Sequence, residues 1–313
     1  MKIISLFPFA APKVVHRFPP EQVRQFWWFL AVIEYLVQRN LKRSRQLFER
    51  LDGRHRVAIF NAREDSPRAY TLRDRTFLLR ESELHALGEL GKFRVITASD
   101  LARYVYAGDH RRMERDLRRL KRQALVSDRT LEISGKKTLR TLTLTRTGKR
   151  LMKTIGRLPE EQAIYHGLVK PREAKHDADL YRLYHKEAAR IARAGGKPLR
   201  VVLDFELKRI LNRERVALGA RKNDPEELQR LAEGHGLAVV DGKIPLPDLR
   251  IEYQTPEGEL RQVDLELATR HYRPQGLAEK AKAGFSIYSP REDAPRLRRI
   301  LDERELTAGI LAL

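Results

Sequence analysis

The sequence contains no cysteine, which excludes disulfide bonds and cysteine-ligated zinc sites. It also lacks an apolar run long enough to cross a bilayer, because the longest such run, residues 26–37, is too short and includes Glu34. The segment before Pro8 has no small-residue cleavage site typical of a signal peptide. Phosphate-binding loops, nucleophile elbows, dinucleotide fingerprints and H-E-x-x-H zinc motifs are missing as well. We therefore expect a cytoplasmic protein without a membrane partner.

Acidic residues are too few to balance the basic ones, and the formal net charge is +21. Residues 101–150 carry 15 basic and 5 acidic side chains, whereas residues 201–313 carry 19 and 20. A local field of this kind attracts a polyanion, of which nucleic acid is the best candidate. Stacking aromatics, which RNA-binding modules use, are scarce in the basic region beyond Tyr104 and Tyr106. The charge pattern favours double-stranded DNA as the partner.

Residues 110–122 predict a helix with one apolar and one basic face. At helical spacing Met113, Leu117 and Leu120 share the apolar side. The opposite side carries Arg111, Arg115, Arg118 and Arg122, with Arg112 and Arg119 at its edges. Guanidinium groups suit phosphates and the acceptor edge of guanine. A salt-bridged, solvated face is the simpler alternative, but between 111 and 122 only Glu114 and Asp116 oppose seven basic groups.

The elements around this helix predict a winged helix-turn-helix domain. A first helix covers 81–90 and is closed by Gly91, Thr97 caps a second helix, and Asp109 caps the arginine-rich one. Strands at 130–133 and 139–144 then form a hairpin with a basic tip, and a further helix covers 145–151. In this arrangement the third helix enters the major groove and the hairpin reaches neighbouring phosphates. The hairpin residues placed for such contacts are Lys136, Lys137 and Arg140.

A long helix is predicted for 21–50, and its first half is apolar on almost every side. Other parts of the protein, or a partner, must therefore cover this half of the helix. Two interpretations stay open, a core helix of the first domain or a homodimer contact. Short strands are predicted at 56–60 and 70–72.

The carboxyl-terminal half alternates helices with strands. Its predicted helices cover 176–194, 276–283, 295–305 and the range 209–234, in which Asp224-Pro225 starts a second helix. Its predicted strands cover 199–207, 236–240, 247–253, 262–267 and 285–288.

A hairpin around residues 256–258 allows a prediction of strand register. A three-residue loop ending in glycine places Asp248 opposite Glu266 and Arg250 opposite Asp264. Asp248, Asp264 and Glu266 then gather on the polar face of the sheet, where their oxygens would suit Mg²⁺ and where Lys280 can approach. A solvated acidic face is the alternative, since Arg250 would partly neutralise it.

A Pro-Asp pair followed by a strand with acidic residues resembles the PD-(D/E)xK nuclease fold over about residues 176–290. The resemblance implies that Asp248 and Glu266 bind the metal. Together with Asp264 from the hairpin register and Lys280 from the following helix, they are the catalytic candidates. In that family a lysine lies two residues after the second acid, but here Ala268 occupies the position. The departure puts metal-assisted hydrolysis in doubt.

With both of these halves, the chain resembles the replication-relaxation family of bacterial plasmids and integrative elements. Residues 93–144 carry this resemblance, together with 246–248, 263–268 and 280–285, whereas residues 1–60 fall outside it. It implies a role in replication or DNA relaxation, or in the transcriptional control of such genes.

The predicted fold class is α+β, with a winged helix-turn-helix domain before an α/β PD-(D/E)xK-like domain. The predicted divisions are a helical or dimerisation segment at 1–60, the DNA-binding domain at 61–157, a linker at 158–175 and the nuclease-like domain at 176–313. The expected function is sequence-selective binding of double-stranded DNA, without a cofactor. The alternative is a Mg²⁺-dependent endonuclease that its winged helix targets to DNA.

Overall fold

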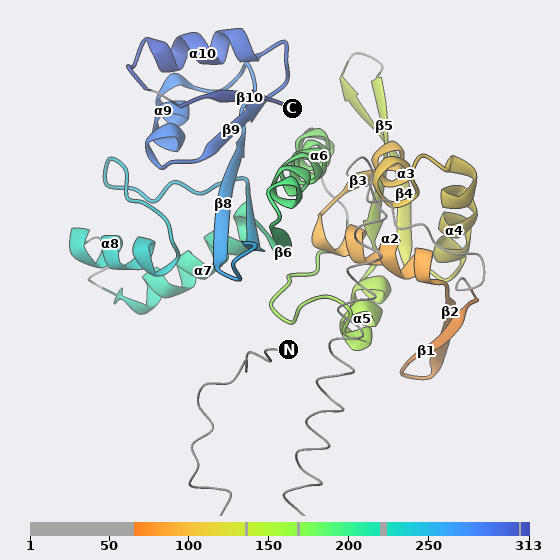
Figure 1. The fold of residues 1–313 in the computed structure, drawn as a ribbon. Helices are drawn as coiled ribbons and strands as arrows, with labels where there is room; N and C mark the ends of the chain where they lie inside the picture. The colour runs from red at the N-terminus through yellow and green to blue at the C-terminus, as the bar shows by residue number, and fades with distance from the viewer. Residues whose placement is uncertain (1–65, 135–136, 168–169, 220–223, 307) are drawn as a thin grey trace, which may run out of the picture. The chain divides into compact units, whose positions relative to one another are not determined.

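A computed structural model of the chain describes residues 66–134, 137–167, 170–219, 224–306 and 308–313 (Figure 1). The fold is α+β, as predicted, and in these described ranges the helices pack around three separate β-sheets. The helix predicted for 21–50, the dimer contact placed on it and the strand predicted for 56–60 lie outside the described residues. Within the described ranges, no helix has both the length and the apolar character that crossing a bilayer requires.

An antiparallel hairpin of β1 (Arg68–Leu72) and β2 (Arg75–Leu79) opens the described part of the chain. The elements that follow are α2 (Glu81–Lys92), β3 (Ile96–Thr97), α3 (Ala98–Val105), α4 (His110–Arg122), β4 (Val126–Ser134), β5 (Lys137–Leu144) and α5 (Arg146–Ile155). Strand β5 lies between β3 and β4 and is antiparallel to both. The predicted order of helix, helix, turn, helix and hairpin is therefore present.

Polar side chains cap three of these helices, two of them at the predicted positions Thr97 and Asp109. Thr97 accepts a hydrogen bond from the backbone N–H of Asp100, and Asp109 accepts one from that of Arg112. Thr145 caps α5 in the same way. Each cap satisfies a backbone donor that has no partner within its own helix.

Gly91 does not end α2, contrary to the prediction, because the helix continues to Lys92. A Cβ atom at Gly91 would lie 3.1 Å from Ile164 and 3.3 Å from Leu144. The glycine therefore permits close packing inside the helix, and it is not the left-handed residue that closes many helices.

The carboxyl-terminal half is built on a five-stranded sheet in the order β10-β9-β8-β7-β6. Its elements are α6 (Pro171–Arg193), β6 (Lys197–Leu203), α7 (Asp204–Ala217), α8 (Pro225–Gly234), β7 (Leu249–Gln254), β8 (Leu260–Leu267), α9 (Pro274–Lys282), β9 (Ser286–Ser289), α10 (Ala294–Asp302) and β10 (Ile310–Ala312). Strands β6, β7 and β8 are antiparallel neighbours, whereas β9 runs parallel to β8 and β10 runs parallel to β9. The predicted register is confirmed, since Arg250 pairs with Asp264 in the ladder of β7 and β8.

Three predicted boundaries differ from the structure. The strand predicted for 199–207 ends at Leu203, because α7 begins at Asp204. The strand predicted for 236–240 is reduced to one isolated bridge between Val240 and Lys243. Helix α6 starts at Pro171, inside the predicted linker, since proline is well tolerated in the first turn of a helix.

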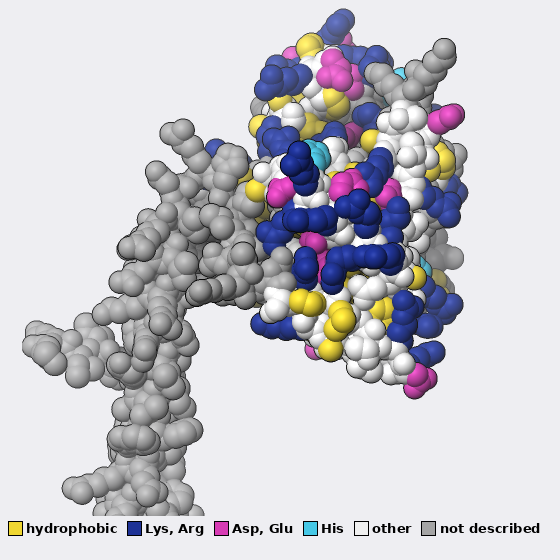
Figure 2. Space-filling model, turned by 90° about the vertical axis from the view of Figure 1, so that its right-hand side faces the viewer, with side chains coloured by type: hydrophobic (Ala, Val, Ile, Leu, Met, Phe, Trp, Pro, Cys, Tyr) yellow, Lys and Arg dark blue, Asp and Glu magenta, His cyan; other side chains and the backbone are white. Residues whose placement is uncertain are grey.

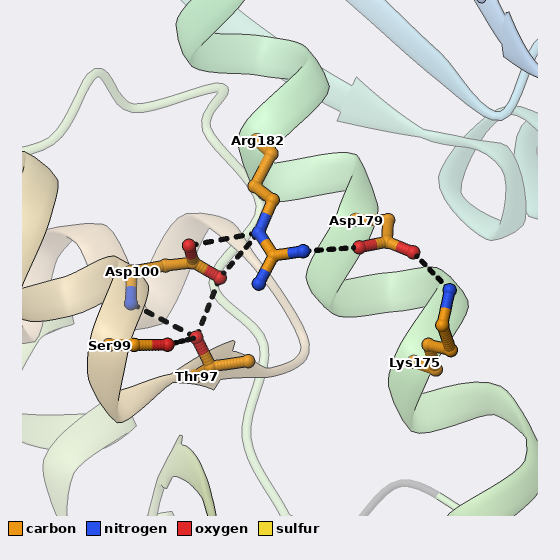
Figure 3. Close-up of polar contacts among 6 residues, drawn as sticks. All are labelled: Thr97, Ser99, Asp100, Lys175, Asp179 and Arg182. Atoms are coloured by element: carbon orange, nitrogen blue, oxygen red, sulfur yellow. Dashed lines mark hydrogen bonds and ion pairs between the residues drawn. The ribbon is translucent and has the colours of Figure 1, made fainter. Parts of the chain in front are cut away.

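Helix α6 packs against both halves and joins them. Tyr181 is fully buried, with its ring 4.9 Å from that of Phe93 and 5.6 Å from that of Tyr104. Arg182 donates from Nε to both carboxylate oxygens of Asp100 at the start of α3, at 2.9 and 3.0 Å (Figure 3). One hydrophobic core runs from Phe77 in β2 through α6 to the five-stranded sheet. The two halves therefore share their interior.

Candidate nucleic-acid interface

Helix α4 begins at a tight turn in which Ala107 and Gly108 both have positive φ, at 55° and 85°. The turn reverses the chain between α3 and α4, and Asp109 then caps the new helix. Met113, Leu117 and Leu120 are buried at 1% exposure or less and anchor the apolar face. The predicted amphipathic helix is therefore present, with its apolar face in the core.

Buried polar contacts fix the orientation of α4. Asp116 is 1% exposed and accepts hydrogen bonds from Ser82 Oγ at 2.7 Å and from Tyr106 OH at 3.1 Å. The Arg119 guanidinium donates to the fully buried carboxylate of Glu83 at 2.7 Å. These contacts tie α4 to α2 and α3, and they explain why Asp116 does not neutralise the exposed arginines. The sequence did not identify Ser82, Glu83 or Tyr106 as the partners.

Four arginines lie along the outer face of α4, and we refer to them as the guanidinium row: Arg111, Arg115, Arg118 and Arg122. All four are exposed, and none forms a salt bridge with a residue in the described part of the chain. Lys and Arg side chains dominate the face of the molecule that carries α4 (Figure 2). Arg112, at the edge of the row, is partly buried and engaged in a contact.

Arg140, which was predicted to contact phosphates, is held by two carboxylates instead. Its guanidinium donates to both oxygens of Asp128, at 3.0 and 2.8 Å, and to those of Glu114. These hydrogen bonds lower the pKa of both carboxyl groups and raise that of Arg140. Asp128 also pairs with Lys121 at 3.0 Å. Arg140 therefore fastens the hairpin to α4.

The hairpin tip carries the other two predicted phosphate contacts. Lys136 lies outside the described residues, and Lys137 is the first residue of β5.

Of the predicted acidic cluster, Asp248 and Glu266 come together at one end of the β7–β8 ladder. The backbone N–H of Asp248 donates to Glu266 Oε2 at 3.3 Å, and Lys280 Nζ lies 2.9 Å from the same oxygen. Asp248 Oδ2 accepts from the backbone N–H of Leu267 at 2.9 Å. Glu266 also accepts from Tyr272 OH, and the amine of Lys280 donates to the carbonyl of Leu246. Burial, followed by repulsion from Asp248, raises the pKa of Glu266 above its usual range.

His176 on α6 is a member of this cluster that the sequence did not reveal. Its Nε2 lies 3.4 Å from Asp248 Oδ2, and its Nδ1 lies 3.7 Å from Asp177 Oδ1. Burial alone would lower the pKa of His176, but hydrogen bonds to Asp177 and Asp248 outweigh it and raise that pKa to about 10. His176 therefore supplies a second cation to the acidic pair.

The residues present do not fit the predicted Mg²⁺ site. Asp264 lies outside the cluster's contacts, because Arg250 holds its two oxygens at 2.6 and 2.8 Å. Lys280 and His176 supply positive charge beside Glu266 and Asp248, where a metal would bind. Among the described residues, no group of three or more acidic or histidine side chains is placed to hold a metal ion. The cluster therefore has protein cations, Lys280 and His176, beside its two carboxylates.

Comparison with known proteins identifies no family for the chain. No family model matches the sequence, and no curated protein matches it. Solved structures do match, among them Bacillus subtilis PadR in complex with operator DNA, which aligns with 50% of this chain and 78% of its own at 16% identity. The TM-score of 0.21 is too low to establish a shared fold.

Proposed function

We propose that the chain is a site-selective, double-stranded DNA-binding protein, in which residues 81–144 form a winged helix-turn-helix. Helix α4 would enter the major groove, whose width admits an α-helix, and the β4–β5 hairpin would act as the wing. Arg111, Arg115 and Arg118 would reach base edges or adjacent phosphates. The lysines of the hairpin tip, Lys136 and Lys137, would bind the phosphate backbone.

The observation that carries the proposal is the unneutralised guanidinium row. The acidic groups nearest in sequence are engaged elsewhere, since Asp116 is buried against Ser82 and Tyr106 and Glu114 is bound by Arg140. Four exposed guanidinium groups along one helix strongly favour a polyanionic ligand. Arg119 and Arg140, which are paired within the protein, would position α4 and the wing and would contact DNA less directly.

A narrower role in replication or relaxation of a mobile element rests on the resemblance to the replication-relaxation family. Within that role the protein would bind a site near genes of the element or at its origin. The homodimer suggested by the segment 21–50 would present two copies of α4 to a palindromic site.

Affinity for a random-sequence duplex tests the proposal at the residues that carry it. Arg115→Gln with Arg118→Gln removes two members of the guanidinium row and is expected to weaken binding at least tenfold. Two lost phosphate contacts would also make the slope of log K against log salt about two units shallower. Fluorescence anisotropy at four or more salt concentrations measures both quantities.

A matched control removes the same charge elsewhere. Arg296 and Arg299 are exposed on α10, and neither forms a salt bridge with a described residue. Changing both to Gln lowers the net charge equally, and affinity is expected to fall less than threefold. Equal effects of the two pairs would mean that net charge alone drives binding, and the proposal would be wrong.

A further inference from the structure

Helix α5 presents a second basic face, separate from the guanidinium row. Its buried side is formed by Gly148, Leu151 and Met152. At helical spacing the cations fall together on the other side: Arg146, Lys149, Arg150 and Lys153. The helix contains no acidic residue, and none of these four forms a salt bridge with a described residue. The outer face of α5 is therefore basic along its whole length.

Helix α7, which belongs to the carboxyl-terminal half, extends this basic surface of α5. The segment 165–167 ties the two helices together, because the Gly167 N–H donates to the carbonyl of Leu144 just before α5 at 2.9 Å and the Tyr165 hydroxyl donates to Glu206 of α7 at 3.0 Å. Burial lowers the pKa of Lys149, and the charges of Lys153 and of Arg209 on α7 lower it further. Arg213 follows Arg209 by one helical turn and is exposed. We refer to Arg146, Lys149, Arg150, Lys153, Arg209 and Arg213 as the α5–α7 surface.

The acidic residues of α7 are engaged away from this surface. Asp204, the first residue of α7, lies beside Asp248, whose carbonyl accepts from its backbone N–H at 3.3 Å. Glu206 is 5% exposed and accepts from Arg200 and, at 3.0 Å, from Tyr165 OH. Glu214 lies 2.8 Å from the ring of His235. Like charges held this close without a counterion destabilise the folded protein, and a bound polyanion would relieve the repulsion. The simpler alternative is a run of charges that only water contacts. That alternative does not explain why Lys149 is half-buried beside two other cations, Lys153 and Arg209.

The α5–α7 surface begins where α4 ends. The backbone N–H of Thr145 donates to the carbonyl of Leu125 at 3.0 Å, and its hydroxyl donates to that of Ala124 at 2.6 Å. These bonds hold the start of α5 against the residues that follow α4, whose last residue is Arg122. Arg146, the first residue of α5, therefore lies beside the segment that follows the guanidinium row.

We propose that the α5–α7 surface is a second DNA-binding site, which binds backbone phosphates of the same duplex beyond the segment that α4 contacts. The inference rests on the proposed function, because it takes duplex DNA as the ligand of α4. Ten helical residues span about 15 Å, which matches a few successive phosphates along one strand. Such contacts would add affinity and salt dependence without sequence preference.

Binding to duplexes of two lengths tests this site. On a duplex of about 40 base pairs the wild-type protein is expected to show a steeper salt slope than on one of about 14, since only the longer duplex reaches the α5–α7 surface. Changing Lys153 and Arg209, both exposed, to Gln is expected to make the slope on the long duplex about two units shallower. Binding to the short duplex is expected to stay within twofold of wild type.

The control pair is again Arg296→Gln with Arg299→Gln, and circular dichroism checks that each variant folds. The inference is wrong if the Lys153/Arg209 variant matches this control on the long duplex. It is also wrong if a preformed protein–duplex complex captures a second labelled duplex through these residues, because the site would then bridge two DNA molecules.

The two proposals fail in different ways. If the Arg115/Arg118 variant weakens binding and the Lys153/Arg209 variant does not, the inference about α5–α7 falls alone. If the Lys153/Arg209 variant alone weakens binding, and does so for both the short and the long duplex, then α4 is not the helix that contacts DNA. The proposed function is then wrong.

Discussion

Arginines of similar chemistry have different roles in this protein because their partners differ. Arg119 and Arg140 are bound by carboxylates from other elements, whereas Arg115 and Arg118 project from α4 without a salt bridge to any residue that the structure describes. An arginine that is already paired within the protein must lose that partner to bind a phosphate. Its contribution to the free energy of DNA binding is therefore smaller. The exposed, unpaired arginines are therefore the ones that we assign to DNA.

The protonated ring of His176 is predicted to stabilise the fold in a pH-dependent way. Its pKa is about 10 in the folded protein and about 6.5 in an unfolded chain. Because the folded-state value is the higher one, the contribution is fully present below pH ~6.5 and is lost as the pH rises through about 10. The side chain is 39% exposed, so solvent screening limits the contribution to about 1 kcal/mol.

Urea unfolding of wild type and His176→Gln between pH 6 and pH 10 measures this contribution. The difference in free energy of unfolding between the two proteins is expected to shrink as the pH rises. Groups that titrate in both proteins cancel in the difference. A difference that stays constant across the range would show that the charge on His176 has no role in stability.

The sequence predicts ladder neighbours better than it predicts partners from distant elements. Asp248 and Glu266 were placed together because a hairpin turn fixes the register of its two strands. His176 lies on a helix more than seventy residues earlier in the chain and reaches Asp248 only through tertiary packing. The pairing of Arg140 with Glu114 is not predicted for the same reason, since no local sequence pattern indicates that β5 will face Glu114.

At the scale of single elements, α4 owes its position to a buried carboxylate. Changing Asp116 to Ala removes the acceptor of the Ser82 and Tyr106 hydroxyl groups inside the core. The free energy of unfolding is expected to fall by about 2–4 kcal/mol, because buried donors lose a charged partner. Chemical denaturation followed by circular dichroism gives the value.

Asp116→Asn is the matched comparison, because it keeps one acceptor oxygen and the same shape. It is expected to cost less than Asp116→Ala. A loss below about 0.5 kcal/mol in the Ala variant would contradict the idea that Asp116 fixes α4.

Helices were predicted more reliably than short strands. The cap residues Thr97 and Asp109 mark helix starts locally, and the apolar spacing of α4 is unambiguous. Strands β2 and β10 were not predicted, because strands of five and three residues carry too little periodic signal. Their pairing partners, β1 and β9, decide whether such short segments become strands.

At the scale of the whole molecule, the shared core predicts that the two halves unfold together. Tyr181 is completely buried on α6, against Phe93 and Tyr104 of the first half. Tyr181→Ala is expected to cost about 3–5 kcal/mol, as for other large aromatic truncations in cores. Hydrogen exchange is expected to accelerate equally in the β4–β5 hairpin and in the β7–β8 ladder.

Tyr184→Phe serves as the control, since it keeps the ring and removes only a hydroxyl group from the same helix. Faster exchange confined to one half of the Tyr181→Ala protein would mean that the halves are independent domains joined at α6.

The central claim is that the guanidinium row reads duplex DNA. Its most direct test is selection of bound duplexes from a random pool, carried out in parallel with wild type, the Arg115→Gln/Arg118→Gln variant and the Arg296→Gln/Arg299→Gln control. We expect one enriched motif for wild type and control, and loss of preference at one or two guanines in the α4 variant, where each bidentate contact contributes about 1–3 kcal/mol. An identical motif from all three proteins, or no motif from wild type, would contradict it.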